Sequence, residues 1–226
     1  MSAINQPQEE DPRVVRSRAA AIEAARELFL RNGYAGTTME EIAAEAGLSK
    51  RTLYNVYADK ASLFTRMVAD VIAYAERFAR ELSAGATLEA AEIDASDVRD
   101  ILHDLGRRLA LAILRPEVIA LRRLLICEGR SFPALADEYF DAAPGRVMAA
   151  LAADFEELMR DGLLRTADPR RAAEQFAYLV AGSPLDRALL LGRAPSEEQL
   201  VAGAKEGVAT FLARYGTGTS ASADPR

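Results

Sequence analysis

Apolar residues recur every three or four positions through most of the chain, a spacing that places them on one face of an α-helix. The first helix is predicted to bury the face formed by Val15, Ala19, Ile22, Ala25 and Phe29. Asn32-Gly33 then supplies a pair suited to a left-handed helix stop. Residues 1–12 hold two Pro, two Gln and three acidic residues without any period, so they are predicted to be a disordered arm.

Two short helices separated by a glycine are predicted next. Segment 38–41, Thr-Met-Glu-Glu, matches a capping box, in which the Thr38 hydroxyl accepts from the Glu41 amide and the Glu41 carboxylate accepts from the Thr38 amide. The apolar stripe of this helix stops before Gly47, where the chain can turn sharply. Ser49 is suited to cap a further helix that ends at Val56. Two short helices joined by such a turn form the helix-turn-helix pattern.

A longer helix is predicted to begin at Asp59 and to carry an apolar face as far as Leu82. Residues 83–97 are small and acidic, and they are predicted to form a loop. Pro144 and Pro184 fall inside two of the remaining helices and predict a break or kink in each. These remaining helices are expected over 98–114, 117–130, 134–161, 168–191 and 196–214.

The predicted fold is therefore all-α, in two domains flanked by two tails. Half of the 226 residues are apolar and there is no Trp, which favours helix over strand nearly everywhere. The N-terminal three-helix domain is expected over 13–60 and the C-terminal helical domain over 61–215, between the arm at 1–12 and a disordered tail at 216–226. No run reaches the roughly eighteen apolar residues of a membrane span, and the polar N-terminus does not resemble a signal peptide. The expected location is cytoplasmic, without membrane contact.

The reactive residues are too few for most catalytic sites. One cysteine, Cys127, and one histidine, His103, exclude an internal disulfide, a zinc site and a Cys/His catalytic pair. Cys127 lies in an apolar run and is predicted to be a small buried residue, and His103 to lie on a helix face. No catalytic residue, metal site or cofactor is predicted. An all-α enzyme and a helical adaptor without DNA binding remain alternatives, but neither explains the cationic segment that follows Ser49.

Charge is distributed unevenly along the chain. The net charge is −6, yet Arg13 to Lys60 carries eight Lys/Arg against six Asp/Glu, while 61–226 carries twenty against twenty-five. Because attraction to phosphates is screened within about 10 Å, a basic face on an acidic protein is compatible with DNA binding. Lys50 and Arg51 are consecutive cations at the start of a short helix, where the helix dipole does not favour them, so their charge is expected to serve an external group.

Residues 18–63 resemble the DNA-binding domain of TetR-family regulators through the motifs AA..LF, GY..TTM, IA..AG, SK.TLY and K..L. Tyr57 departs from the pattern, since the family more often has Phe there. Residues 120–191, with ICEGRSFPALADEYF, DGLL and ADPRRAAEQF, are similar to the C-terminal domain of the AefR-like branch. The resemblance implies a helix-turn-helix DNA-binding domain followed by a helical domain for ligand sensing and dimerisation.

The resemblance also implies which residues touch DNA. The helix that begins at Ser49 is expected to enter the major groove. The phosphate contacts are expected from Thr37, Thr38, Tyr54, Tyr57 and Lys60. The base contacts are expected from Lys50, Arg51, Thr52 and Asn55. Thr38 is in the first place a helix cap, with a phosphate contact as a second role.

The C-terminal domain is expected to bind a small, mainly apolar effector that releases a repressor from its operator. Apolar residues that would line its pocket are Leu105, Leu109, Ile113, Leu124, Phe132, Phe140, Phe155 and Phe176. The alternative is a fully packed core, and no charged residue stands out as a partner for a ligand charge. The last two helices are expected to form a four-helix homodimer interface through Leu179, Val180, Leu189, Leu190, Leu191, Leu200, Val208, Phe211 and Leu212. The helix from Asp59 to Leu82 is expected to couple the domains.

Overall fold

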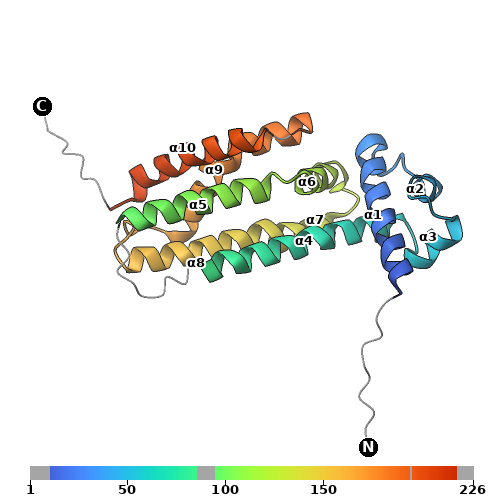
Figure 1. Cartoon of the computed structure of the whole chain (residues 1–226), viewed down its shortest axis with the longest axis horizontal. Helices are drawn as coiled ribbons and strands as arrows, with labels where there is room; N and C mark the ends of the chain where they lie inside the picture. The colour runs from blue at the N-terminus through green and yellow to red at the C-terminus, as the bar shows by residue number, and fades with distance from the viewer. Residues whose placement is uncertain (1–10, 86–94, 194, 218–226) are drawn as a thin grey trace, which may run out of the picture.

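The computed structural model describes residues 11–85, 95–193 and 195–217. Their helices form an elongated molecule, with α1, α2 and α3 at one end and a bundle of longer helices making up the rest (Figure 1). The elements are α1 (Pro12–Asn32), α2 (Met39–Glu45), α3 (Lys50–Val56), α4 (Lys60–Gly85), α5 (Ala95–Ile113), α6 (Pro116–Glu128), α7 (Pro133–Phe140), the π-helical turn η1 (Asp141–Gly145), α8 (Arg146–Arg160), α9 (Pro169–Leu191) and α10 (Glu197–Tyr215). The all-α prediction is confirmed.

Local capping determines where the N-terminal helices begin. Asp11 accepts a hydrogen bond from the Arg13 amide, and Pro12 occupies the first turn of α1, where no amide donor is needed. The capping box of α2 is complete, with both the Thr38 hydroxyl and the Glu41 carboxylate in place. Ser49 accepts from the Thr52 amide at the start of α3. The predicted caps of α2 and α3 are therefore confirmed.

The apolar interior forms two clusters that do not divide at residue 60. One cluster joins the end of α4 to α5, α8, α9 and α10. The other contains the buried faces of α1, α2 and α3 and the first half of α4, but it also includes Leu121, Leu124 and Leu125 from α6 and Tyr139 from α7. The core of the helix-turn-helix region is thus completed by residues from the middle of the chain.

An aromatic cluster holds these parts together. The Phe132 ring lies 5.0 Å from that of Tyr34 and 5.1 Å from that of Phe64, and Phe29 contacts both Tyr34 and Phe64. Phe132 belongs to the connection between α6 and α7, whereas Phe29 and Tyr34 belong to the N-terminal region. Burying one such ring stabilises a fold by roughly 1.5–3 kcal/mol, so this contact is a substantial link between the N-terminal region and the middle of the chain.

Several predicted elements differ from the structure. The helix expected over 134–161 is divided by η1, which contains Pro144, so the predicted break there is confirmed. Pro184, in contrast, lies inside an uninterrupted α9. On α1, Val15 and Ala19 are exposed, because the buried face begins only at Ala21. Two residues assigned to the C-terminal tail are ordered: Gly216 bridges to Leu164, and the Thr217 hydroxyl donates to the Leu163 carbonyl. Residues 1–10, 86–94 and 218–226 of the predicted tails and loop lie outside the described residues.

Three further observations concern the described residues only. None of their helices combines the length and apolar character that a membrane span requires. They contain no group of three or more His, Cys, Asp and Glu side chains placed to hold a metal ion. Cys127 is exposed, which corrects the expectation that it is a buried residue, because Ile126 and Cys127 lie on the outer face of α6 while Leu124 and Leu125 face the core.

Candidate DNA-binding surface and effector cavity

Helix α3 lies at one end of the molecule (Figure 1), and most of its exposed side chains are polar. Leu53 is fully buried and anchors the helix, whereas Arg51, Tyr54 and Asn55 are exposed and Thr52 is half-buried. Tyr54 is a large aromatic residue with 47% of its surface exposed, which a folding role does not require. The side chains of α3 predicted to contact DNA, Lys50, Arg51, Tyr54 and Asn55, therefore point away from the core.

The two cations at the start of α3 differ in their partners. The Lys50 ammonium lies 3.1 Å from a carboxylate oxygen of Glu40 on α2, and this contact lowers the pKa of Glu40. The expectation that both charges serve only an external group is therefore wrong for Lys50, because folding brings Glu40 from the neighbouring helix. Among the described residues, Arg51 forms no ion pair, so its guanidinium is the cation of α3 that is available to a ligand.

Thr37 and Thr38 are used inside the fold. Only 1% of the Thr37 surface is exposed, and its hydroxyl donates to the Gly33 carbonyl at 2.9 Å. The Thr38 hydroxyl donates to the Glu41 carboxylate at 2.9 Å, and the Thr38 amide donates to the same oxygen at 2.8 Å. These bonds lower the pKa of Glu41. Both hydroxyls therefore have an acceptor within the fold, and the phosphate contacts expected from these two residues stay predictions.

Lys60 and Tyr57 also have structural roles. The Lys60 ammonium donates to the Tyr34 and Thr37 carbonyls, both at 2.6 Å, and lies 4.4 Å from the centre of the Tyr34 ring. Lys60 therefore joins the start of α4 to the connection between α1 and α2, instead of standing free for a phosphate. Tyr57 is buried, and burial raises the pKa of its hydroxyl. Tertiary packing thus gives both side chains a role within the fold, and the phosphate contacts expected from them stay predictions.

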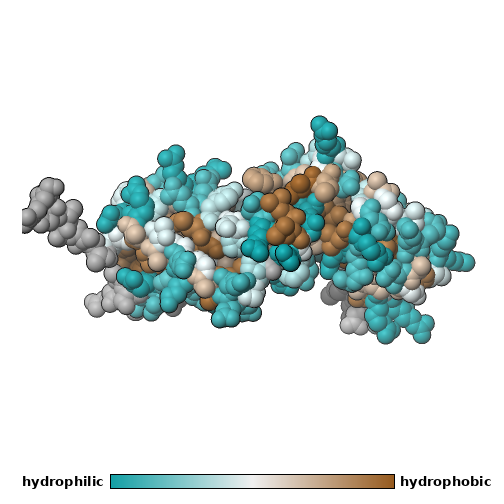
Figure 2. All heavy atoms as spheres, turned by 90° about the horizontal axis from the view of Figure 1, so that it is seen from above, coloured by the Kyte–Doolittle hydropathy of each residue, from teal (hydrophilic) through white to brown (hydrophobic). Residues whose placement is uncertain are grey.

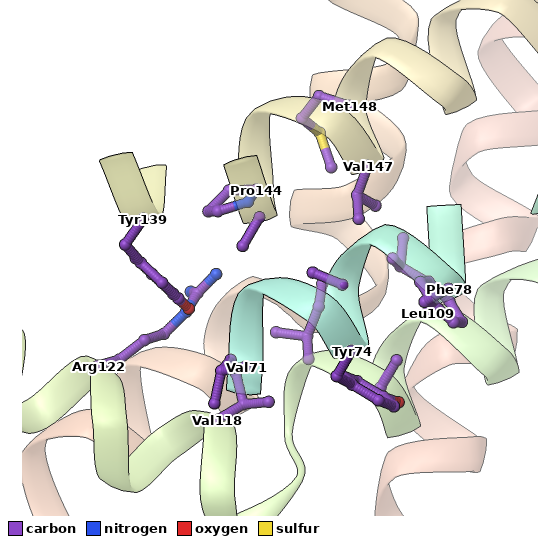
Figure 3. Close-up of a pocket in the computed structure, with 14 residues that line it drawn as sticks. Val71, Tyr74, Phe78, Leu109, Val118, Arg122, Tyr139, Pro144, Val147 and Met148 are labelled. Carbon is purple, nitrogen blue, oxygen red and sulfur yellow. The ribbon is translucent and has the colours of Figure 1, made fainter. Parts of the chain in front are cut away.

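A cavity lies between α4, α5, α6, α7, η1 and α8 (Figure 3). Its volume is about 80 Å³, and it is partly open to solvent. Most of its wall is apolar, and it is lined by Val71, Tyr74, Ala75, Phe78, Leu109, Ala112, Ile113, Val118, Arg122, Tyr139, Ala143, Pro144, Val147 and Met148. Mainly apolar concave sites with a few polar groups are typical of small-molecule binding.

The polar groups of this cavity gather on one side. The side chains of Arg122 and Tyr139 meet there, whereas Phe78 and Leu109 lie on the opposite side (Figure 3). The Arg122 Nε donates to the Tyr139 hydroxyl at 3.0 Å. Arg122 is the one charged residue that lines the cavity, and none of the ion pairs in the described part of the chain includes it.

The predicted pocket residues are divided between cavity and core. Leu109 and Ile113 line the cavity. Leu105 and Phe155 border a second hollow at the far end of the bundle. The remaining predictions are corrected: Leu124 and Phe132 pack into the helix-turn-helix core, Phe176 is enclosed by Phe155 and Phe211, and Phe140 is 65% exposed.

Sequence reasoning missed the α4 wall and Arg122. The α4 positions, Val71, Tyr74 and Phe78, form a helical stripe that also fits ordinary core, so no local signal separates the two. Arg122 lies one helical turn after Val118 on a helix that buries Leu121 and Leu125 as well. A charge on that apolar face is the signal that could have identified it.

The second hollow contains a buried acid on α8. Asp154 borders it together with Asp100, Asp104, Arg108 and Glu157. Burial raises the pKa of Asp154 to about 6, and the nearby charge of Glu157 adds to the shift. Because this pKa lies above the ordinary value of 3.8, the folded chain binds the proton more tightly than the unfolded chain does. The ionised carboxylate therefore costs stability, and this cost grows between about pH 4 and pH 6.

We expect Asp154→Asn to stabilise the protein at neutral pH and to have little effect near pH 4. After allowance for solvent screening, a gain of about 1–2 kcal/mol corresponds to a rise in Tm of roughly 2–6 °C above pH 6. Thermal unfolding followed by circular dichroism between pH 4 and pH 8 measures this difference. Asp161→Asn is the control, because Asp161 is exposed and directly follows α8. This variant should change Tm little at any pH. A gain that is equal at every pH would contradict the ionisation of Asp154 as its cause.

An apolar surface is exposed on α9. Tyr178, Leu179, Leu190 and Leu191 are large side chains that no other element covers, and Tyr178 and Leu190 are about three-quarters exposed, at 75% and 73%. Figure 2, which views the molecule from the α10 side, shows apolar surface gathered midway along it, where Figure 1 places α6 and the start of α10. Helix α10 packs closely against α9, since a Cβ on Gly207 would lie 2.4 Å from the Leu179 carbonyl oxygen.

The predicted dimer residues divide in the same way. Leu179, Leu190 and Leu191 are exposed, and Leu189 and Leu212 are half-buried. In contrast, Val180, Leu200, Val208 and Phe211 are buried within their own chain, because α5 packs against the inner faces of α9 and α10. These four are corrected from interface to core residues.

This combination of a helix-turn-helix with a separate helical domain and cavity defines a ligand-responsive class of transcriptional regulator. Two family profiles match the chain. One, described as bacterial regulatory proteins of the tetR family, covers residues 21–67, and the other, described as the C-terminal domain of AefR-like transcriptional repressors, covers residues 100–217. The second match alone spans more than half of the chain. The protein belongs to the TetR family of transcriptional regulators and has an AefR-like C-terminal domain.

Solved structures are similar over nearly the full length. A TetR-family transcriptional regulator from Mesorhizobium loti is 32% identical, with 91% of this chain and 100% of that chain covered and a TM-score of 0.70. The flavonoid-responsive regulator FrrA is 27% identical, with 91% and 100% covered and a TM-score of 0.62. A complex of SmeT with triclosan, 22% identical with 89% and 92% covered and a TM-score of 0.58, shares the fold. No curated protein matches the chain in a sequence comparison. TetR-family regulators are typically non-enzymatic DNA-binding proteins.

Proposed function

We propose that this protein is a homodimeric repressor that leaves its operator when a small, mainly apolar effector binds the cavity. The observation that carries the proposal is the position of α6. Val118 and Arg122 on this helix line the cavity, while Leu124 and Leu125 pack into the core of the helix-turn-helix region. A ligand that displaces α6 therefore acts on both sites at once.

Helix α4 provides a second connection. Its residues Val71 and Tyr74 line the cavity, and its first turn is tied by Lys60 to the connection between α1 and α2. An effector that favours a different tilt of α4 and α6 changes the separation of the two α3 helices in a dimer. By linkage, a tenfold loss of operator affinity requires a tenfold weaker binding of the effector to the DNA complex, a coupling of about 1.4 kcal/mol.

The DNA contacts follow from the exposed face of α3. Arg51, Thr52 and Asn55 are assigned to base edges in the major groove, and Tyr54 to a phosphate. Lys50 can join them when a phosphate competes with Glu40. One such helix reads few base pairs, so a specific site needs two copies in successive major grooves about 34–36 Å apart.

The second copy is assigned to the outer face of α9 and α10. On α9, Tyr178, Leu179 and Leu190 form an apolar stripe, and α10 adds the small exposed residues Ala202, Ala209 and Ala213. Small residues allow helices to approach closely, and two α9–α10 pairs related by a two-fold axis form a four-helix interface. The proposed repressor acts in the cytoplasm, where operator DNA lies, and has no catalytic role.

The proposal is tested by measuring operator binding with and without compounds that occupy the cavity. Fluorescence anisotropy of labelled DNA from upstream of the gene gives the affinity, and a thermal-shift screen of planar aromatic compounds selects the effectors. This class is chosen because the related regulator FrrA is flavonoid-responsive and because Tyr74 and Phe78 line the cavity. We expect compounds that raise Tm to weaken operator binding at least tenfold. Failure of the protein to bind the upstream DNA at moderate salt would contradict the repressor, whereas binding that no cavity ligand changes would contradict the sensor.

A further inference from the structure

We propose that the cavity selects ligands that carry a negative charge, and that Arg122 is the residue that holds this charge. The inference rests on the proposed effector cavity and deepens it by naming the chemical class: an amphipathic anion with a planar, apolar body. Sequence reasoning nominated no charged residue for such a role, and the structure places one in the cavity wall.

The guanidinium of Arg122 puts a positive charge on the cavity wall. A guanidinium remains charged at physiological pH, and a charge in a mainly apolar site is costly unless it is paired. Arg122 is half-buried and has no carboxylate partner within ion-pair distance among the described residues. On the helices that surround the cavity, Glu76 of α4 pairs with Arg146 of α8 at 2.9 Å instead. The positive charge on the cavity wall is therefore not neutralised by the protein.

The second step concerns the donors. Arg122 uses its Nε–H for the Tyr139 hydroxyl, and no hydrogen bond from its Nη1 or Nη2 is found in the described part of the chain. Since Tyr139 accepts that bond with its oxygen, its own O–H proton is free to point elsewhere. The terminal nitrogens of Arg122 and the Tyr139 hydroxyl together offer donors for two oxygens, which is the geometry that a carboxylate or sulfonate requires.

The third step concerns the body of the ligand. The remainder of the wall is apolar, and Tyr74 and Phe78 contribute aromatic rings from α4. Figure 3 shows Arg122 and Tyr139 on one side of the cavity and Phe78 and Leu109 on the opposite side. A ligand with its charged group at Arg122 would place its apolar part against α4, α5 and α8.

A pair of fluorescent dyes isolates the charge. 8-Anilinonaphthalene-1-sulfonate and N-phenyl-1-naphthylamine share the same aromatic body, and only the first carries a sulfonate. Both are titrated into the intact protein and into the variants Arg122→Met, Arg122→Lys and Arg123→Met. Arg123 is the matched control, since it neighbours Arg122 on α6 but does not line the cavity. Circular dichroism confirms that each variant is folded.

We expect Arg122→Met to weaken binding of the sulfonate dye by about ten- to a hundredfold, the usual effect of losing charge-assisted hydrogen bonds. The uncharged dye should bind all variants within a factor of about three. Arg122→Lys should restore part of the lost affinity because it keeps the charge, and Arg123→Met should behave as the unchanged protein. Should Arg122→Met fail to fold, the Lys variant and the ratio of the two dyes on the unchanged protein decide the question.

Ala112→Phe, which fills the cavity wall, identifies dye bound elsewhere, because only cavity binding should be lost in this variant. Equal loss of both dyes in Arg122→Met, or no loss of either, would overturn the selection for anions while leaving the sensor function intact. Selective loss of the sulfonate dye without any effect of either dye on operator binding would support the anion site and contradict the sensor. Binding of neither dye would overturn the cavity as a site for this class.

Discussion

Replacement of Arg51 by alanine is expected to lower operator affinity by about thirtyfold or more in the dimer. Arg51 is the exposed cation of α3 that forms no ion pair among the described residues, so a base edge or phosphate is the partner that its guanidinium lacks. A bidentate arginine contact to guanine contributes about 1–3 kcal/mol, and a dimer makes the contact twice. Anisotropy titrations with labelled upstream DNA measure the loss.

Two further variants serve as a control and a comparison for Arg51→Ala. Arg170→Ala removes a fully solvated arginine from the start of α9, far from α3, and should leave the affinity unchanged. Lys50→Ala should cost less than Arg51→Ala, because Glu40 already satisfies part of the Lys50 charge. If Arg51→Ala bound the operator as well as Arg170→Ala does, the assigned face of α3 would be wrong.

Replacement of Leu190 by aspartate is expected to convert the dimer into monomers and to abolish specific operator binding. Leu190 is 73% exposed on α9, and a charge there would be buried without a partner in the α9–α10 interface. Loss of a central interface side chain typically costs about 2 kcal/mol, and the two-fold axis makes each loss occur twice. Light scattering at micromolar concentration should give twice the 24.5 kDa chain mass for the unchanged protein and the single mass for the variant.

Phe140→Asp is the control for this experiment, since Phe140 is 65% exposed on α7 and lies outside the assigned interface. This variant should remain dimeric. A protein that is monomeric without any substitution would contradict the proposed α9–α10 interface. A Leu190→Asp variant that stays dimeric would contradict it as well.

The local features of the fold were readable from the sequence because their causes are local. The capping box at Thr38 and Glu41, the Ser49 cap and the break at Pro144 each depend on residues within one or two helical turns. The apolar period located every long helix. Pro184 does not break its helix, because α9 packs against α8 and α10, and tertiary packing outweighs the loss of one backbone hydrogen bond.

The site was less readable because its residues are defined by distant partners. Lys60 binds carbonyls of Tyr34 and Thr37, more than twenty residues away, and Arg122 meets Tyr139 from another helix. Sequence spacing carries no information on such pairs. The corrected interface residues have the same cause, since an apolar residue such as Phe211 fits a core and an interface equally well until α5 is placed beside it.

The aromatic contact of Phe132 has a consequence for engineering. A simple design for a chimaera would join the DNA-binding region, α1 to α3, to the sensor domain of another regulator at the start of α4. In this protein the hydrophobic core of the DNA-binding region is incomplete without Phe132, Leu124 and Leu125 from the sensor domain. A chimaera cut at residue 60 would separate Tyr34 from both Phe64 and Phe132, whereas one that transfers the first half of α4, α6 and the connection to α7 together with the DNA-binding region would keep these contacts. A change of operator specificity by domain exchange therefore also requires exchange of α6, which lines the cavity.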